Sequence, residues 1–193
     1  LLTLSRDAQL QAAVAAIAPG RFRRDLTDAR YQARVCYTKA LRRFVYDGAA
    51  FEEILANREL KQLFFRTFGY KGSMNFTLYP DCWIRDLPLL EFGEKAYLAD
   101  GVVLGTNQVS RDQEFITVAG ITVESLAVID QEVMLGYGSR IGAGCAISVR
   151  CIIGMRSHLG AGSSMAPRST VGHHCHVGEF AQIGHEAFIG SFS

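Results

Sequence analysis

The sequence predicts a mainly β protein in which a parallel β-helix follows an α-helical N-terminal segment. Two observations predict the β-helix: after residue 122 an aliphatic side chain returns at every sixth position, and a small side chain returns four positions after it. An α-helix cannot keep every sixth residue on one face, whereas a chain that turns a corner every six residues can. A third observation, the helical spacing of apolar residues before residue 68, predicts the helices.

The two series run to the end of the chain. The aliphatic series, expected to fill the coil, comprises Val123, Ile129, Leu135, Ile141, Ile147, Ile153, Leu159, Met165, Val171, Val177, Ile183 and Ile189. The small series, expected at the bends, comprises Ala127, Val133, Ser139, Cys145, Cys151, Ser157, Ser163, Ser169, Cys175, Ala181, Ala187 and Ser193. Three of the five cysteines belong to it, so we expect buried small residues there rather than disulfides or metal ligands.

The division into domains follows from these periodicities. Residues 1–68 form an expected helical domain, with helices over about 4–17, 25–46 and 51–65 that Pro-Gly and Asp-Gly pairs separate. An aromatic-rich connector over residues 69–91 is expected to cap the open end of the coil, and residues 92–193 form the β-helix domain. The repeat slips between Leu104 and Val123, which are 19 residues apart, one more than three units. This slip predicts a small bulge or loop.

Composition narrows the classes of function. The 193 residues carry a formal net charge of +1, which gives no electrostatic case for binding nucleic acid or an anionic membrane surface. No apolar run is long enough to span a membrane and no signal segment is recognisable, so a cytoplasmic protein is expected. The chain lacks an initiating Met, and its last repeat stops at Ser193, which suggests a fragment or a missing terminal cap.

Quoted in register, the units begin VESLAV, IDQEVM, LGYGSR and IGAGCA. This pattern resembles the hexapeptide-repeat acyltransferase superfamily, whose members fold as left-handed parallel β-helices, and the resemblance covers roughly the last 110 residues. It implies transfer of an acetyl or other short acyl group to a hydroxyl or amine of a small molecule. The implied donor is acetyl-CoA or an acyl carrier protein thioester, and the implied assembly is a homotrimer with active sites between subunits.

One segment resembles a particular group within that superfamily. Residues 171–179, VGHHCHVGE, are similar to the pattern V-[DE]-H-D-C-x-[IV]-G-[DE] of sugar O- and N-acetyltransferases related to sialic acid O-acetyltransferase. The resemblance places His173 at the position of the general base, a role that suits imidazole near neutral pH. Gly172 and His174 stand where that group has acids, so no neighbouring carboxylate orients the ring of His173.

Residues 18 apart are expected to stack on successive coils about 4.8 Å apart. Arg150 and Arg168 form one such column, which could seat the phosphates of CoA or of a carrier-protein arm, or could be a solvated ladder relieved by Glu186. His158 and His176 form a second column with Arg140. These neighbours should lower the proton affinity of the imidazoles, which makes both histidines alternative base candidates or interface residues.

Two other functions compete with acyl transfer. The missing acids beside His173 favour a non-catalytic trimeric scaffold, in which the helices and the coil organise partners. The γ-class carbonic anhydrases share this type of coil and bind zinc through histidines. Gly184-His185 matches the first half of their ligand pattern, but Gly190 stands in the second half, so no metal is expected.

Overall fold

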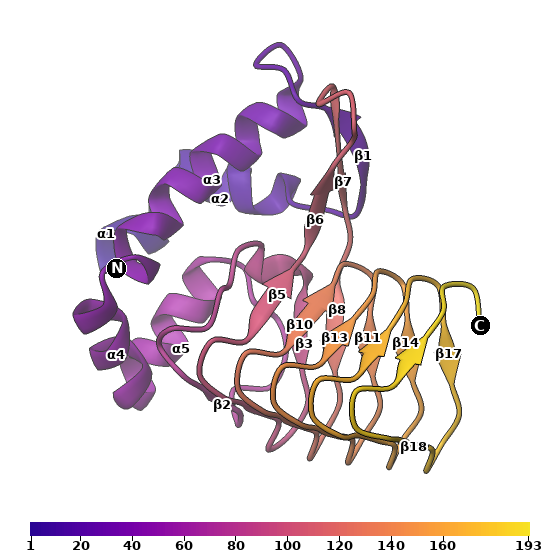
Figure 1. Cartoon of the computed structure of the whole chain (residues 1–193). Helices are drawn as coiled ribbons and strands as arrows, with labels where there is room; N and C mark the ends of the chain where they lie inside the picture. The colour runs from indigo at the N-terminus through magenta and orange to yellow at the C-terminus, as the bar shows by residue number, and fades with distance from the viewer.

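The computed structural model describes residues 1–193 and places five α-helices at one end of a parallel β-helix (Figure 1). The helices are α1 (Leu2–Ser5), α2 (Ala8–Ala16), α3 (Ala29–Val45), α4 (Gly48–Ala56) and α5 (Arg58–Thr67). A short 3₁₀ helix, η1 (Leu87–Leu89), precedes the regular coils. None of the helices combines the length and the apolar character needed to cross a membrane.

Three parallel sheets form the sides of the coil. Sheet one contains β5 (Val103–Gly105), β10 (Met134–Gly136), β13 (Ile152–Ile153), β16 (Thr170–Val171) and β19 (Phe188–Ile189). Sheet two contains β3 (Leu90–Phe92), β8 (Ile121–Val123), β11 (Arg140–Ile141), β14 (His158–Leu159) and β17 (His176–Val177). Sheet three contains β2 (Thr77–Leu78), β4 (Tyr97–Leu98), β9 (Val128–Ile129), β12 (Ala146–Ile147), β15 (Ser164–Met165) and β18 (Gln182–Ile183).

The register of these sheets confirms the predicted β-helix. Partners on neighbouring coils are 18 residues apart, as in the pairing of Ile141 with Leu159 and of Leu159 with Val177. Nearly all of the aliphatic series lies in the interior, and the buried cysteines occupy its corners. The six-residue period therefore does what the sequence predicts: one branched side chain in each unit fills the coil, and a small one allows the chain to turn.

Glycine at the second position of a unit allows the coils to stack closely. A Cβ on Gly142 would lie 2.6 Å from the backbone nitrogen of Ala161 on the next coil, closer than packed atoms approach. Gly142→Ala is therefore expected to lower the free energy of unfolding by about 1–3 kcal/mol through overpacking. Gly178 occupies the same corner two coils later, and a Cβ there would meet nothing within 4 Å.

Gly178→Ala is the matched control for this prediction. Chemical denaturation of both variants should show a loss of stability for Gly142→Ala and almost none for Gly178→Ala. Equal losses in the two variants would contradict the close approach of the coils at Gly142.

In place of the small bulge or loop expected before Val123, the structure has a β-hairpin that projects from the coil. Strands β6 (Asn107–Val109) and β7 (Phe115–Val118) pair antiparallel. Leu104 and Val123 are separated by a single corner of the coil, from sheet one to sheet two, and the hairpin is inserted into that corner. The distance of 19 residues resembled three repeat units plus one only by coincidence.

The hairpin joins the coil to the helical segment. Strand β1 (Gly20–Arg23), which the sequence analysis did not foresee, pairs antiparallel with β7 and completes a three-stranded sheet. Figure 1 shows this sheet rising from the coil alongside α3. One cluster of 43 buried apolar residues runs from the helices through the whole coil. The division into three domains stays a prediction.

Two helix boundaries differ from expectation because side chains cap the backbone. The second helix begins at Ala29 rather than near Asp25, because the Asp28 carboxylate accepts the N–H groups of Arg30 and Tyr31. The third expected helix is two helices, α4 and α5. Asn57 separates them, and its side chain accepts two N–H groups of the first turn of α5.

The aromatic-rich connector forms the first, irregular turn of the coil. Strand β2 pairs with β4, and Trp83 forms a parallel bridge with Val103 of β5. Phe76 and Tyr70 are buried against Phe92, so aromatic rings fill the coil at this end. The capping role expected for this segment stays a prediction.

Candidate active site

Four histidines gather where the chain passes from sheet one to sheet two. We call this corner the histidine edge; it comprises His158, His173, His174 and His176. The turns at this corner leave strands β10, β13, β16 and β19, and the β6–β7 hairpin is the insertion at the same corner of an earlier coil. The repeat thus aligns these side chains along the coil axis.

His173 is held by contacts with the coils on both sides. The backbone N–H of Met155 donates to Nδ1 of His173 over 3.0 Å, and the N–H of His173 donates to Oγ of Ser191 over 3.0 Å. A neutral imidazole that accepts at Nδ1 carries its proton on Nε2. In this arrangement the outer nitrogen of His173 is a hydrogen-bond donor.

His158 and His176 stack as the spacing predicts. They are direct partners in the pairing of β14 with β17, and their ring centroids are 4.9 Å apart at an interplanar angle of 78°. Burial, and then the nearby His176 and Arg140, lower the pKa of His158 below its usual 6.5, while Glu124 opposes the shift. His158 is therefore a neutral imidazole with a free lone pair at pH 7.

Arg140 is fixed beside this pair by an acid that the sequence analysis missed. Nη2 of Arg140 lies 2.5 Å from Oε1 of Glu124, and the other carboxylate oxygen accepts the N–H of Ala143 over 3.1 Å. The two residues are 16 rather than 18 apart, so the stacking rule alone does not find the contact. The carboxylate of Glu124 therefore partly offsets the effect of the Arg140 charge on the pKa of His158.

Arg150 and Arg168 lie on another corner and each has a carboxylate partner. Nε of Arg150 is 2.5 Å from Glu132, and Nη1 of Arg168 is 3.4 Å from Glu186. Hydrogen bonding and charge from Arg150 lower the pKa of Glu132. The column of Glu132, Arg150, Arg168 and Glu186 therefore has an acid at each end and two basic residues in its centre, and all four side chains are exposed. The 18-residue spacing from Glu132 to Arg150 is the signal that could have revealed the first pair.

The described chain contains no group of three or more His, Cys, Asp or Glu side chains arranged to hold a metal ion. His185, the residue considered for a zinc site, approaches Glu186 at 3.9 Å.

Comparison with known proteins finds similarity in structure but not in sequence. No protein-family model matches the chain, and no curated protein is significantly similar to it in sequence. Among solved structures, the chain is similar to the acetyltransferase domain of PglB from Neisseria gonorrhoeae in complex with acetyl coenzyme A. The two are 22% identical over 69% of this chain and 58% of that chain, with a TM-score of 0.51.

Two further solved structures are similar to the chain. The hexapeptide-repeat-containing acetyltransferase VCA0836 from Vibrio cholerae, complexed with acetyl coenzyme A, is 15% identical over 90% of this chain and 91% of that chain, with a TM-score of 0.43. A mutant of GDP-perosamine N-acetyltransferase from Caulobacter crescentus, in complex with CoA and GDP-perosamine, is 18% identical over 69% and 59%, with a TM-score of 0.42.

At these identities the likeness to the PglB domain establishes the fold. The resemblance to hexapeptide-repeat acyltransferases is thus confirmed for the architecture: the chain is a β-helix of the kind found in an acetyltransferase domain. The chain spans 58% of the length of that PglB domain chain.

Proposed function

We propose that the chain is an acyltransferase that moves an acetyl or other short acyl group from a thioester to a hydroxyl or amine of a small molecule. The histidine edge is the observation that carries this proposal, because it offers a neutral imidazole and an imidazole donor on a coil shared with an acetyltransferase domain. The thioester is acetyl-CoA or an acyl carrier protein. The PglB domain and VCA0836 structures contain acetyl coenzyme A, which favours the first.

In the proposed reaction His158 is the general base. Its neutral ring takes the proton of the acceptor as the acceptor oxygen or nitrogen attacks the thioester carbonyl. The tetrahedral intermediate then expels the thiolate of the donor, which receives the proton back from the imidazolium. His176, which meets His158 edge to face, adds to the burial that lowers the pKa of His158 and is the second base candidate.

His173 complements this base through its outer nitrogen. Because Nδ1 accepts from Met155, Nε2 presents an N–H that can donate to the carbonyl oxygen as negative charge develops there. His173 acts as a base instead if Nδ1 gives up this contact, which is the role that the sequence resemblance implies.

The proposal includes a cytoplasmic homotrimer. Sheet one presents apolar side chains outward on both sides of Thr170: Met134 and Ile152 are about half exposed, and Phe188 is more exposed still. Such a stripe supports packing of one coil against another. Five free thiols suit a reducing compartment. Light scattering of the purified chain measures the subunit number directly.

The test is release of free thiol from acetyl-CoA in the presence of amine and hydroxyl sugars, with an acyl carrier protein thioester as the alternative donor. We expect acceptor-dependent thiol release and a higher melting temperature with CoA. Intact, folded protein that neither releases thiol nor responds to CoA would contradict the proposal and support the non-catalytic scaffold.

Arg150 and Arg168 are proposed to contact the phosphates of CoA. The double variant Arg150→Ala, Arg168→Ala is expected to weaken CoA binding about tenfold or more, because two charge-assisted contacts are lost. Calorimetric titration measures the change. Lys95→Ala is the control, since Lys95 is an exposed cation at the same position of its unit, on the corner between β3 and β4 that carries neither the histidines nor the two arginines. Unchanged affinity in the double variant would leave the two arginines as a surface ion-pair ladder.

A further inference from the structure

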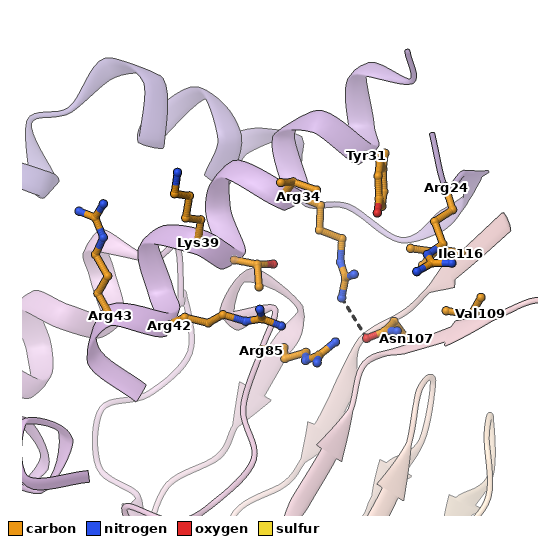
Figure 2. Close-up of a pocket in the computed structure, with 12 residues that line it drawn as sticks. Arg24, Tyr31, Arg34, Lys39, Arg42, Arg43, Arg85, Asn107, Val109 and Ile116 are labelled. Atoms are coloured by element: carbon orange, nitrogen blue, oxygen red, sulfur yellow. Dashed lines mark hydrogen bonds between the residues drawn. The ribbon is translucent and has the colours of Figure 1, made fainter. Parts of the chain in front are cut away.

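A basic cavity of about 680 Å³ lies between α3, the β6–β7 hairpin and the connector. Figure 2 shows Arg34 and Arg42 reaching from α3 toward Arg85 and Asn107, and Tyr31 pointing its hydroxyl the same way. Lys39 and Arg43, on the rim, extend away from this convergence. The cavity is built by α3, the hairpin and the connector, all of which lie outside the regular repeat.

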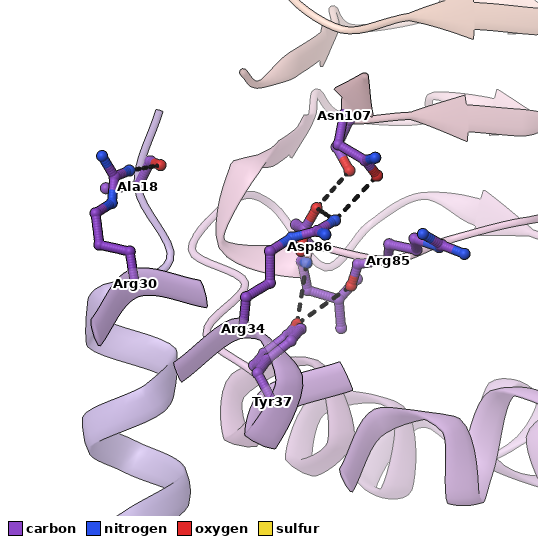
Figure 3. Close-up of polar contacts among 9 residues, drawn as sticks. Ala18, Arg30, Arg34, Tyr37, Arg85, Asp86 and Asn107 are labelled. Carbon is purple, nitrogen blue, oxygen red and sulfur yellow. Dashed lines mark hydrogen bonds and ion pairs between the residues drawn. The ribbon is translucent and has the colours of Figure 1, made fainter. Parts of the chain in front are cut away.

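Positive charge in this cavity is not balanced. Its twelve lining residues include six cations and no Asp or Glu, although the whole chain carries a net charge of only +1. Of these six cations only Arg34 has an ion-pair partner. Its guanidinium donates two hydrogen bonds, of 3.1 and 2.8 Å, to the buried carboxylate of Asp86 (Figure 3). Like charges brought together in a concave site repel one another, and a bound anion would relieve the repulsion.

Two of the unpaired arginines are already positioned. The guanidinium of Arg42 lies over the ring of Tyr46 at 5.4 Å, and that of Arg85 lies over Trp83 at 4.8 Å. Tyr46 and Trp83 stack on each other at 5.5 Å, so one aromatic pair supports both cations. Nε of Arg85 is shielded from solvent and has no hydrogen-bond partner, which leaves a buried donor unsatisfied.

We propose that this cavity binds the phosphoryl group of a small-molecule ligand. Arginine forks match two oxygens of a phosphate, and Arg42 and Arg85 would supply them from opposite walls. The hydroxyls of Tyr31 and Thr38, which also line the cavity, are suitable further donors. The ligand class is a phosphate ester or diphosphate, whether it belongs to CoA or to a nucleotide-linked molecule.

The site is separate from the histidine edge. Asn107 and Val109 face the cavity from β6, whereas Gln108 between them turns to the other side and accepts a hydrogen bond from Tyr137 of the coil corner over 3.3 Å. The cavity thus lies on the face of the hairpin opposite to the coil corner. The proposed phosphoryl site therefore does not depend on the proposed acyl transfer. A chain that binds pyrophosphate but shows no acyl transfer would contradict only the proposed acyl transfer.

Calorimetric titration of the full chain with inorganic pyrophosphate, ADP and CoA at low salt tests the proposal. We expect Arg42→Gln to weaken pyrophosphate binding about tenfold or more, because a charge-assisted contact is lost. The neighbouring Arg43→Gln removes the same charge from the same helix but from a side chain that points away, and should change the affinity less than about twofold. Arg85→Gln should act like Arg42→Gln, with circular dichroism verifying its fold.

The three probes distinguish the source of the phosphoryl group. If Arg42→Gln also weakens CoA binding, and pyrophosphate displaces CoA, the acyl donor occupies the cavity. If Arg42→Gln weakens ADP binding but leaves CoA binding unchanged, a separate nucleotide-linked ligand occupies it. Absence of pyrophosphate, ADP and CoA binding overturns the proposal. An equal loss in Arg42→Gln and Arg43→Gln overturns it as well, since general charge attraction would then suffice.

Discussion

Replacing His158 with alanine is expected to lower kcat/KM for acyl transfer by about 10²–10⁴-fold, the usual contribution of a positioned general base. The substitution removes the half-buried neutral imidazole whose lowered pKa keeps a lone pair available at pH 7. Thiol release from acetyl-CoA measures the rate. His185→Ala is the control, because His185 lies on another corner and approaches only Glu186.

The pH dependence gives this prediction a second readout. Because the pKa of His158 lies below 6.5, the ring loses its proton at lower pH than an unperturbed histidine. The acid limb of kcat/KM should therefore fall below pH 6.5, with activity retained above it. A near-normal rate for His158→Ala would remove His158 as the base.

His173 variants separate a donor from a base. His173→Ala should cost about 10²–10³-fold if Nε2–H stabilises the oxyanion, and His173→Asn should recover part of the loss because its side chain keeps an N–H donor. If His173 is the base, asparagine should do no better than alanine, and His158→Ala should be nearly normal.

Asp86→Ala is expected to lower the free energy of unfolding by about 3–5 kcal/mol, because it leaves the buried Arg34 uncompensated. Asp86 is fully buried, and its carboxylate also accepts the hydroxyl of Thr106 over 2.6 Å. It therefore ties the connector both to α3 and to the base of the hairpin. Chemical denaturation measures the change.

A double substitution tests the cause of this loss. Replacing both Arg34 and Asp86 with leucine or methionine removes the charges together and should restore much of the stability. Glu186→Ala, which breaks the exposed pair with Arg168, is the control and should change stability little. A double variant as unstable as Asp86→Ala would show that packing around the pair, rather than its charge, matters.

The sequence predicts the coil well because each unit repeats the same physical requirement. Ile141 and Cys145 can be placed from the period alone, and the stacking of His158 on His176 follows from a spacing of 18. The local repeat thus determines both the interior and the outward columns. The assignment of roles to the histidines still depends on contacts across coils, such as Met155 with His173, that a column does not reveal.

The hairpin and the basic cavity could not be predicted in this way. Strand β1 becomes a strand only because β7, almost a hundred residues later, offers it an edge. The cavity depends on Arg34 and Arg42 of one helix and on Arg85 of the connector, which no repeat or motif of the sequence links. Periodicity reports local geometry, whereas these sites arise where non-repeating segments meet.

The inserted hairpin leaves the alignment of the coils around it unchanged. Strands β3, β4 and β5 pair with β8, β9 and β10 in a constant register, from Phe92 with Val123 to Leu104 with Leu135. A corner of this coil can therefore accommodate a longer or shorter excursion without shifting any later strand. Evolution could alter what such an excursion recognises while leaving the histidines in place, so ligand selectivity and chemistry can diverge separately in proteins built this way.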